Sequence, residues 1–261
     1  MRIVIKVGGT LLDDSSGRKG LAKQLVEVAR QHELVVVHGG GKQVTRFLEE
    51  RGISSRFVRG LRVSDLPVID AVTKVIAGSV NKQLVAAILA AGESAVGISG
   101  VDGLLTPATE LDQDLAFVGK PGKTDGRLLN LLINAGYLPV IACIAGDENG
   151  NIYNINADQM AVSCATALRA ERLLFLTDVP GVKGGNGEIA SYLAPEESSK
   201  LIATGVASGG MQAKLEAAKT ALDNGIDEVI IGPGQEPDVC LRVLSGEKLG
   251  TRLLFHAPAE I

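Results

Sequence analysis

A lysine stands near the end of the first predicted strand and is followed by two glycines, in Ile3-Val4-Ile5-Lys6-Val7-Gly8-Gly9-Thr10. A buried strand favours a continuous apolar run, so an ammonium group inside it is costly to desolvate. Glycine lacks a Cβ atom and lets backbone N–H groups come close to a ligand. A cation beside such N–H groups is typical of a phosphate site. The alternative is a strand-end lysine whose ammonium group reaches solvent, and Lys6 alone does not decide between the two.

A second glycine cluster follows the second predicted strand, where Leu34-Val35-Val36-Val37-His38 runs into Gly39-Gly40-Gly41. A helical pattern begins near Lys42, so the N–H groups at this helix start are available to an anion. Three consecutive glycines cost conformational entropy, which makes a purely structural turn the less favoured interpretation. Two strands that both end in glycines predict one site at the carboxyl ends of a parallel sheet.

Three polar residues in the middle of the chain are candidates for substrate contacts. Arg62 lies in the segment Gly60-Leu61-Arg62-Val63-Ser64-Asp65, and its planar guanidinium suits bidentate pairing with a carboxylate. A lone arginine in a polar loop is more often simply solvated. Asn154 and Asp158 flank a predicted helix start at which Asn156 is the expected N-cap. The carboxylate of Asp158 interacts favourably with the helix dipole, or it orients lysines at a cationic site. In the second interpretation Asn154 holds a polar substrate group. The two interpretations are compatible.

The last third of the chain contributes two further candidates. Thr177 and Asp178 follow a predicted buried strand, where ligands bind in open sheets, although a turn around Pro180-Gly181 is the structural alternative. Ser208-Gly209-Gly210-Met211 opens a predicted helix that carries Lys214 near its start. The helix dipole disfavours a cation at that end, so Lys214 indicates an anion nearby.

Two common nucleotide motifs are absent or incomplete. Gly122-Lys123-Thr124 resembles the end of a Walker A loop, but Phe117 stands where its first glycine belongs, so we interpret the segment as a hairpin turn. No G-x-G-x-x-G follows a predicted strand, so the sequence does not favour a dinucleotide site.

The alternation of strands and helices predicts an α/β fold, a three-layer α/β/α sandwich with a mainly parallel central sheet. The strands are expected at 2–7, 34–37, 95–98, 139–142, 173–176, 228–231 and 251–255. Helical patterns are expected around Leu25, around Val44, from Pro67 to Ile88, at 157–168 and at 211–222. Residues 110–124 and 144–155 carry turn signals and are expected to form hairpins over the sheet edge. No linker divides the chain, so a single domain over residues 1–261 is expected.

Composition excludes several classes of protein. The net charge of the 261 residues is −4, aromatic residues make up 3% and tryptophan is absent, so nucleic acid is not an expected partner. Scattered Cys143, Cys164 and Cys240 fit a reducing compartment. The three histidines, among them His256, lack metal-ligand spacing. No signal peptide and no apolar stretch of membrane-spanning length is recognised, so a cytoplasmic protein without a membrane partner is expected.

Taken together, these motifs resemble the amino-acid kinase family over nearly the whole chain. The matching segments run in order: KVGG at Lys6, HGGG at His38, GLRVSD at Gly60, VNK at Val80, GISG-x-DG at Gly97, YNINAD at Tyr153, LTDVPGV at Leu176, GGM-x-x-K at Gly209 and a closing GT at Gly250. The combination of GLRVSD, NINAD and GGM-x-x-K is similar to the branch of the family that acts on N-acetyl-L-glutamate.

The resemblance implies an N-terminal lobe of about residues 1–170 that binds the acyl-amino acid and a C-terminal lobe of about 171–261 that binds ATP. It implies that Lys6, Lys214 and Asp158 are catalytic, with the phosphates of ATP and Mg²⁺ lying across the two lysines. The acceptor's γ-carboxylate is expected on Gly40 and Gly41, and its α-carboxyl end on Arg62 and Asn154. The residues expected to border the nucleotide are Gly8, Gly9, Thr177, Asp178, Gly181, Gly209, Gly210 and Met211.

The implied reaction is phosphorylation of the γ-carboxylate of N-acetyl-L-glutamate by ATP, the second step of arginine biosynthesis. A short, arginine-insensitive homodimer is expected because the sequence starts at the strand before Lys6, and the long helix after Pro67 is a candidate dimer face. One alternative is a sister kinase for another acid, such as carrier-linked aminoadipate. Another is a non-catalytic nucleotide or amino-acid sensor, against which the presence of Lys6, Asp158 and Lys214 argues.

Overall fold

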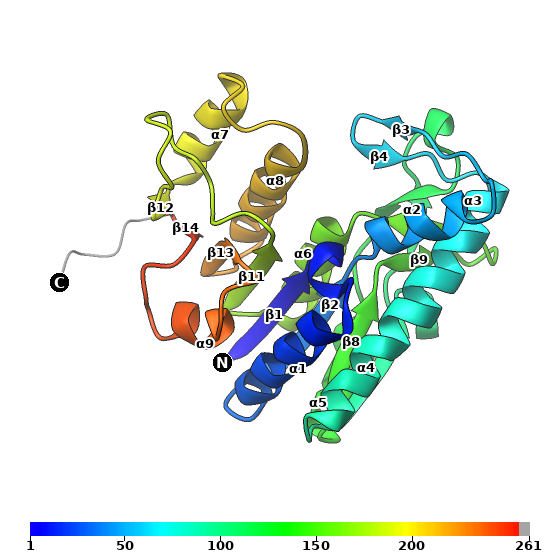
Figure 1. The fold of residues 1–261 in the computed structure, drawn as a ribbon, viewed down its shortest axis with the longest axis horizontal. Helices are drawn as coiled ribbons and strands as arrows, with labels where there is room; N and C mark the ends of the chain where they lie inside the picture. Colours follow the sequence, from blue (N-terminus) through cyan, green and yellow to red (C-terminus); the bar gives the residue numbers. More distant parts are fainter. Residues whose placement is uncertain (256–261) are drawn as a thin grey trace.

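An eight-stranded sheet runs through the centre of the molecule (Figure 1). The computed structural model describes residues 1–255, so His256 and the end of the C-terminal lobe expected from sequence lie outside the described part. The strand order is β12-β14-β13-β11-β1-β2-β8-β5. The six strands from β13 to β5 pair in parallel. Their bounds are Glu228–Pro233 for β13, Arg172–Thr177 for β11, Arg2–Val7 for β1, Glu33–His38 for β2, Leu138–Ala142 for β8 and Ala95–Ser99 for β5.

The first two strands of the order, β12 and β14, run against the other six. β14 (Thr251–Leu253) pairs antiparallel with β13, and the short β12 (Tyr192–Leu193) pairs in parallel with β14. The sequence predicted a final strand to Phe255, which is longer than observed, and did not predict β12. The mainly parallel sheet itself is confirmed. Its central strands are apolar on both faces, as Val4, Ile5, Val36 and Leu174 are fully buried.

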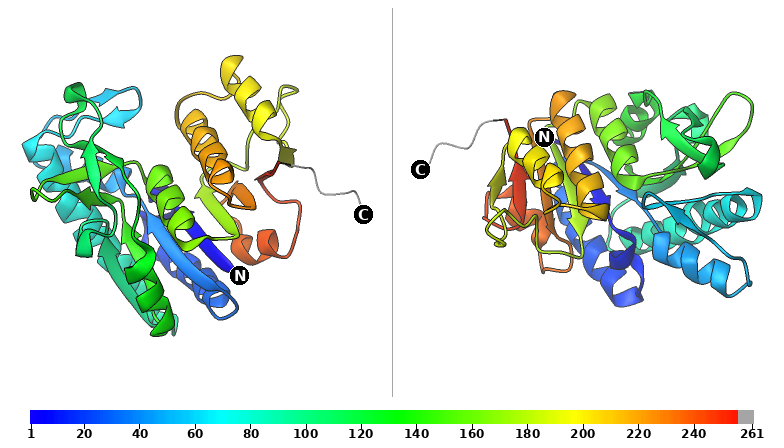
Figure 2. Two further views of the ribbon diagram at one scale, coloured as in Figure 1. Left: turned by 180° about the vertical axis from the view of Figure 1, so that it is seen from behind. Right: turned by 90° about the horizontal axis from the view of Figure 1, so that it is seen from above.

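Helices cover both faces of this sheet, which confirms the three-layer sandwich (Figure 2). One layer contains α9, α1 and α4, and the other contains α5, α6 and α8, with α7 packed on α8. The bounds are Ser15–Ala29 for α1, Asn81–Ala90 for α4, Gly126–Asn134 for α5, Ala157–Leu168 for α6, Pro195–Ala203 for α7, Gly209–Asp223 for α8 and Val239–Leu244 for α9. Helices α5, α7 and α9 were not predicted from the sequence.

Two of the helices near the candidate residues, α6 and α3 (Leu66–Val72), begin at side-chain caps. The Asn156 side chain accepts hydrogen bonds from the backbone N–H groups of Asp158 and Gln159, so Asn156 is the N-cap of α6, as expected. Asp65 caps α3 by accepting from the N–H of Val68. α2 (Gly41–Glu49) begins directly after Gly40 and α8 begins at Gly209 after Ser208, and neither helix has a side-chain cap.

α3, a π-helical segment (Thr73–Val80) and α4 form one continuous helix of 25 residues, Leu66–Ala90. By length and composition this helix could span a membrane. The prediction that no apolar stretch of the sequence reaches membrane-spanning length is therefore wrong. Its buried side chains, such as Ile76 and Leu84, belong to the hydrophobic core, as in a core helix of a soluble protein. The π-helical segment, which no sequence signal predicted, packs against the loop that contains Gly40.

A second sheet consists of four strands in the order β6-β7-β10-β9. The expected hairpins are present, since β6 (Ala108–Glu110) pairs antiparallel with β7 (Val118–Pro121), and β9 (Ile144–Gly146) with β10 (Ile152–Ile155). Parallel pairing of β7 with β10 joins the two hairpins. Gly122-Lys123-Thr124 is not a hairpin turn, because it leads from β7 into α5. A small hairpin of β3 (Phe57–Val58) and β4 (Leu61–Arg62) forms a separate two-stranded sheet.

Candidate active site

One buried carboxylate holds two lysines that are far apart in the sequence. Asp158 Oδ1 lies 2.9 Å from Lys6 Nζ, and Asp158 Oδ2 lies 3.4 Å from Lys214 Nζ. Lys6 comes from the carboxyl end of β1, Asp158 from the first turn of α6 and Lys214 from the first turns of α8. The side chains of Lys6, Asp158 and Lys214 are only 9%, 6% and 15% exposed, so the ion pairs are shielded from water.

The charges around Asp158 determine its protonation. Burial raises the pKa of this carboxyl, but the ammonium groups of Lys6 and Lys214 outweigh burial, and the pKa lies below the ordinary value. Two ammonium groups share one carboxylate, so the cluster carries a net positive charge. A cluster of this kind attracts an anion that can reach both ammonium groups.

The two glycine loops touch each other beside this cluster. The N–H of Gly8 donates to the Leu176 carbonyl at 3.1 Å, which fixes the first loop on β11. A Cβ atom on Gly9 would lie 3.3 Å from Gly40 Cα and 3.3 Å from Gly41 N, so the first loop has little room for a side chain at this contact. A Cβ atom on Gly40 would lie 3.2 Å from Ile76 Cγ1 in the π-helical segment. The glycines therefore bring two sets of backbone N–H groups together.

A buried polar network lies beneath the second glycine loop. His38 is fully buried, and its Nδ1 lies 2.9 Å from the Gly39 carbonyl oxygen. Because a carbonyl only accepts, Nδ1 carries the proton, and Nε2 accepts from Asn81 Nδ2 at 3.0 Å. Asn81 also donates to the Val140 carbonyl and accepts from Lys82 Nζ. The network joins the loop to β8 and to the long helix.

His38 makes stability depend on pH in a defined range. Burial lowers the pKa of His38 from 6.5 to about 4. Between these values the unfolded chain binds a proton that the folded protein does not, so the free energy of unfolding falls as the pH falls. The free energy of unfolding, measured with urea, should fall by about 3 kcal/mol between pH 7 and pH 4 because of this group. A His38→Gln variant should show a shallower slope; equal slopes would contradict the assignment. Asp158, whose pKa is lowered from 3.8, contributes only at lower pH.

The acceptor-side candidates are joined by hydrogen bonds. The Arg62 guanidinium donates to Ser55 Oγ, to the Gly41 carbonyl and to Thr45 Oγ1, and it stacks on the Phe57 ring with 4.6 Å to the centroid. All these partners are neutral, and burial lowers the pKa of Arg62. Within residues 1–255 Arg62 has no carboxylate within salt-bridge distance, so a bound anion would supply its counter-charge.

Asn154 is connected to Arg62 through Ser64. Asn154 Nδ2 donates to Ser64 Oγ at 3.1 Å, and Ser64 Oγ donates to the Arg62 carbonyl at 3.0 Å. Ser64 is fully buried, so both contacts are protected from water. The structure therefore connects Gly41, Arg62 and Asn154, although they belong to α2, β4 and β10.

The nucleotide-side candidates divide into two groups. Thr177 Oγ1 donates to Asp178 Oδ1 at the end of β11, and the Gly210 carbonyl lies 3.4 Å from Lys214 Nζ. Gly209 has a φ of +55° and begins α8 with Gly210 and the half-buried Met211. Gly181 differs, because a Cβ atom there would lie 2.8 Å from both Ile189 and Thr251, which explains the glycine by packing.

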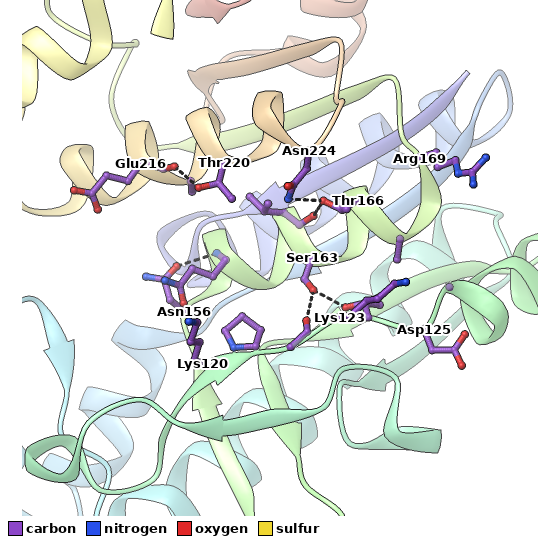
Figure 3. Close-up of a pocket in the computed structure, with 18 of the residues that line it drawn as sticks. Lys120, Lys123, Asp125, Asn156, Ser163, Thr166, Arg169, Glu216, Thr220 and Asn224 are labelled. Atoms are coloured by element: carbon purple, nitrogen blue, oxygen red, sulfur yellow. Dashed lines mark hydrogen bonds between the residues drawn. The ribbon is translucent and has the colours of Figure 1, made fainter. Parts of the chain in front are cut away.

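A separate cavity of about 1080 Å³ lies between α6, α8 and the loop from β7 to α5 (Figure 3). None of the site residues predicted from sequence lines it. Several of its polar groups bond one another, since Ser163 Oγ donates to the Gly122 carbonyl and Asn224 Nδ2 to Thr166 Oγ1. We therefore assign the chemistry to the lysine cluster and not to this cavity.

The arrangement suits transfer of a group between two anions. A net positive cluster and two N–H-rich glycine loops lie together, and the described residues contain no group of three His, Cys, Asp or Glu side chains that could hold a metal ion. Gln43, which donates to the Gly9 carbonyl, was not predicted from the sequence as a site residue. No role was predicted for His38 or Asn81. A buried asparagine within an apolar helix was the one available signal for Asn81.

A family model and the named relatives agree with each other. The model of the amino acid kinase family matches residues 1–232. An acetylglutamate kinase from Solibacter usitatus is 51% identical over 255 residues, which cover 97% of this chain and 99% of that protein. An acetylglutamate kinase from Acidobacterium capsulatum is 42% identical over 257 residues, covering 95% of this chain and 99% of the relative.

Solved structures share the fold. N-acetylglutamate synthase from Neisseria gonorrhoeae, complexed with coenzyme A and N-acetyl-glutamate, superposes with a TM-score of 0.87 at 25% identity. The match covers 98% of this chain but 60% of that one. Carbamate kinase from Giardia has a TM-score of 0.72 at 18% identity, covering 98% of this chain and 99% of that chain, which is a likeness of fold alone.

Proposed function

Since this chain belongs to the amino acid kinase family, we propose that it transfers the γ-phosphoryl group of ATP to the γ-carboxylate of N-acetyl-L-glutamate. The products are N-acetyl-L-glutamyl 5-phosphate and ADP, and the reaction is the second step of arginine biosynthesis. The observation that carries the proposal is the bridging of Lys6 and Lys214 by Asp158 beside two touching glycine loops. The identity of 51% to a named acetylglutamate kinase over nearly the full chain supports the choice of acceptor.

The proposed chemistry needs charge stabilisation more than proton transfer. A carboxylate oxygen of the acceptor forms a bond to the γ-phosphorus, and the bond from that phosphorus to the β,γ-bridging oxygen breaks, so ADP leaves with the electron pair. The acceptor is already ionised at neutral pH, so no general base is required. Lys6 and Lys214 offset the negative charge on the transferring group, and Asp158 keeps the two ammonium groups aimed at it.

The acceptor is proposed to lie between the second glycine loop and the β3–β4 hairpin. Backbone N–H groups of Gly40 and Gly41 bind its γ-carboxylate, and Arg62 and Asn154 bind the α-carboxyl end. The absence of a carboxylate partner for Arg62 within residues 1–255 supports this role, because a buried guanidinium favours an anion. The N-terminal part of the chain, about residues 1–170, is thus the acceptor lobe.

ATP is proposed to lie over the carboxyl ends of β11 and β13, in the lobe of about residues 171–261, next to the carboxyl end of β1 from the other lobe. Gly8, Gly9 and the start of α8 at Gly209, Gly210 and Met211 border its phosphates, with Thr177, Asp178 and Gly181 nearby. Mg²⁺ would be held mainly by the phosphates, as is usual for this ion, and would help neutralise their charge. The lack of a cluster of three metal-ligating side chains within residues 1–255 fits that arrangement.

A trapping assay tests this function. The purified protein is incubated with ATP, Mg²⁺ and one acyl-amino acid at a time, and hydroxylamine converts any acyl phosphate into a hydroxamate. We expect ADP and hydroxamate in equal amounts with N-acetyl-L-glutamate and little with aspartate, carbamate or carrier-linked aminoadipate. ADP release without hydroxamate would contradict a carboxylate acceptor, and neither product with any acceptor would favour a sensor.

Replacement of Arg62 should mainly affect acceptor binding. In Arg62→Lys the planar fork is lost, and lysine reproduces neither the bidentate contact nor the stacking on Phe57. We expect the KM for N-acetyl-L-glutamate to rise about 10- to 100-fold, the value of one or two charge-assisted hydrogen bonds, with the KM for ATP little changed. Arg56→Lys, at an exposed position before the same hairpin, is the matched control. If only the KM for ATP rose, Arg62 would contact the nucleotide and not the acceptor, which would contradict this role.

The assembly and location are part of the same proposal. The long helix presents exposed Leu66 and Leu89, 68% and 53% exposed, which supports a homodimer face on this helix. Light scattering of the purified protein should give twice the chain mass of 27.1 kDa. The free, buried thiols Cys143, Cys164 and Cys240 suit the reducing cytoplasm, where ATP is available.

A further inference from the structure

The amide of Gln43 lies at the contact between the two glycine loops. Gln43 belongs to the first turn of α2, directly after the second loop. Its Nε2 donates to the carbonyl oxygen of Gly9 in the first loop at 2.9 Å, across 34 positions of the sequence. A Cβ atom on Gly9 would lie 3.2 Å from Gln43 Oε1, and one on Gly40 would lie 3.8 Å from it. The side chain thus touches both loops at once.

The other atom of this amide is unusual. Gln43 Oε1 is buried and accepts no hydrogen bond from any described residue. A buried acceptor without a donor costs stability, so the glutamine stands here at a local energetic cost. The hydrogen bond to the Gly9 carbonyl requires a donor, which an apolar side chain does not have.

The beginning of α2 is also held by hydrogen bonds from Arg62, which belongs to the proposed acceptor site. Arg62 donates to the Gly41 carbonyl at 3.0 Å and to Thr45 Oγ1 at 2.6 Å. Gln43 holds the same turn on the opposite loop, so a shift of either loop is transmitted to the other. Phosphoryl transfer requires the attacking oxygen within about 3–3.5 Å of the phosphorus, and a misplacement of about 1 Å can cost 100-fold.

We propose that Gln43 is a positioning residue that sets the spacing between the phosphate loop at Gly8–Gly9 and the acceptor loop at Gly40–Gly41. It acts through the Gly9 carbonyl and does not itself contact the reacting atoms. The inference rests on the proposed function, because that function puts one anionic reactant on each loop. A neutral amide fits between two anions, whereas a carboxylate would repel both and cannot donate to Gly9.

Two substitutions test this role. Gln43→Met keeps the length but removes the donor, and we expect kcat to fall about tenfold with both KM values within twofold of wild type. Gln43→Glu is isosteric and adds a charge, so its kcat at pH 8 should fall about tenfold further. Gln31→Met makes the same exchange at an exposed position of the chain and should leave kcat unchanged.

The pH profile separates positioning from a general structural role. A protonated carboxyl regains a donor, so the deficit of Gln43→Glu relative to wild type should shrink as the pH falls from 8 to 5. A deficit independent of pH, a Gln43→Met enzyme with wild-type kcat, or a fall in kcat matched by a fall in Tm would each overturn the inference. Wild-type hydroxamate formation in the same assay shows that the proposed function stands even when the inference fails.

Discussion

Replacing Lys6 with methionine should lower kcat by about 10²–10³, the usual effect of removing one donor aimed at transition-state charge. Lys6 Nζ is 2.9 Å from Asp158 and belongs to the cluster proposed to meet the triphosphate. Methionine has a similar length and fills the same space, so the loss would report the missing charge. The KM for N-acetyl-L-glutamate should change little, because the acceptor is held by other groups.

The folded state of this variant should survive. Asp158 keeps Lys214 as a partner at 3.4 Å, so no carboxylate is left buried and unpaired. Lys19→Met removes a lysine from an exposed position of α1 and is the matched control. The measurements are initial rates by ADP release, together with the Tm of both variants. Near-wild-type turnover with Lys6→Met would exclude Lys6 from the chemistry.

Asp158→Asn should impair both turnover and stability. The amide cannot neutralise the two ammonium groups of Lys6 and Lys214, which would remain buried and close together. Removing one partner of a buried ion pair typically costs about 3–5 kcal/mol, so we expect a loss of that size in the free energy of unfolding. The lysines would also separate, so kcat should fall by about 10² or more.

Nucleotide binding distinguishes this explanation from simple misfolding. The loss of a negative charge makes the cluster more positive, so a non-hydrolysable ATP analogue should bind at least as tightly as it binds to wild type. The bound triphosphate would supply the missing counter-charge, so the analogue should raise the Tm of Asp158→Asn more than that of wild type. Asp223→Asn, exposed at the end of α8, is the control. Weaker analogue binding would show that Asp158 has another role.

Local sequence signals were sufficient for the fold class and for most site candidates. Apolar runs of three or four residues in β1, β2 and β11 predict burial on both faces, which a covered parallel sheet provides. Glycines placed at strand ends, and a lysine beside them, carry their chemistry in the type of residue itself. Asn156 was recognisable as an N-cap because capping involves only the next two or three residues.

Other features depend on contacts between distant segments and had no local signal. The direction of β14, the parallel pairing of β7 with β10 and the π-helical segment all follow from how neighbouring elements pack. Short helices such as α9 have too few residues for a periodic pattern to identify them. The expectation that no apolar stretch reaches membrane-spanning length was wrong for a different reason, because the helix Leu66–Ala90 meets that criterion by length and composition alone.

The sequence by itself determined which groups can bind anions: ammonium groups, a guanidinium and backbone N–H groups freed by glycine. The tertiary structure decided which of them meet. Residue type sets the charge of a side chain, but the distance between two charges depends on the whole chain. Only the folded sheet brings Lys6 and Lys214 onto one carboxylate and brings the Gln43 amide onto the Gly9 carbonyl, 34 positions away in the sequence.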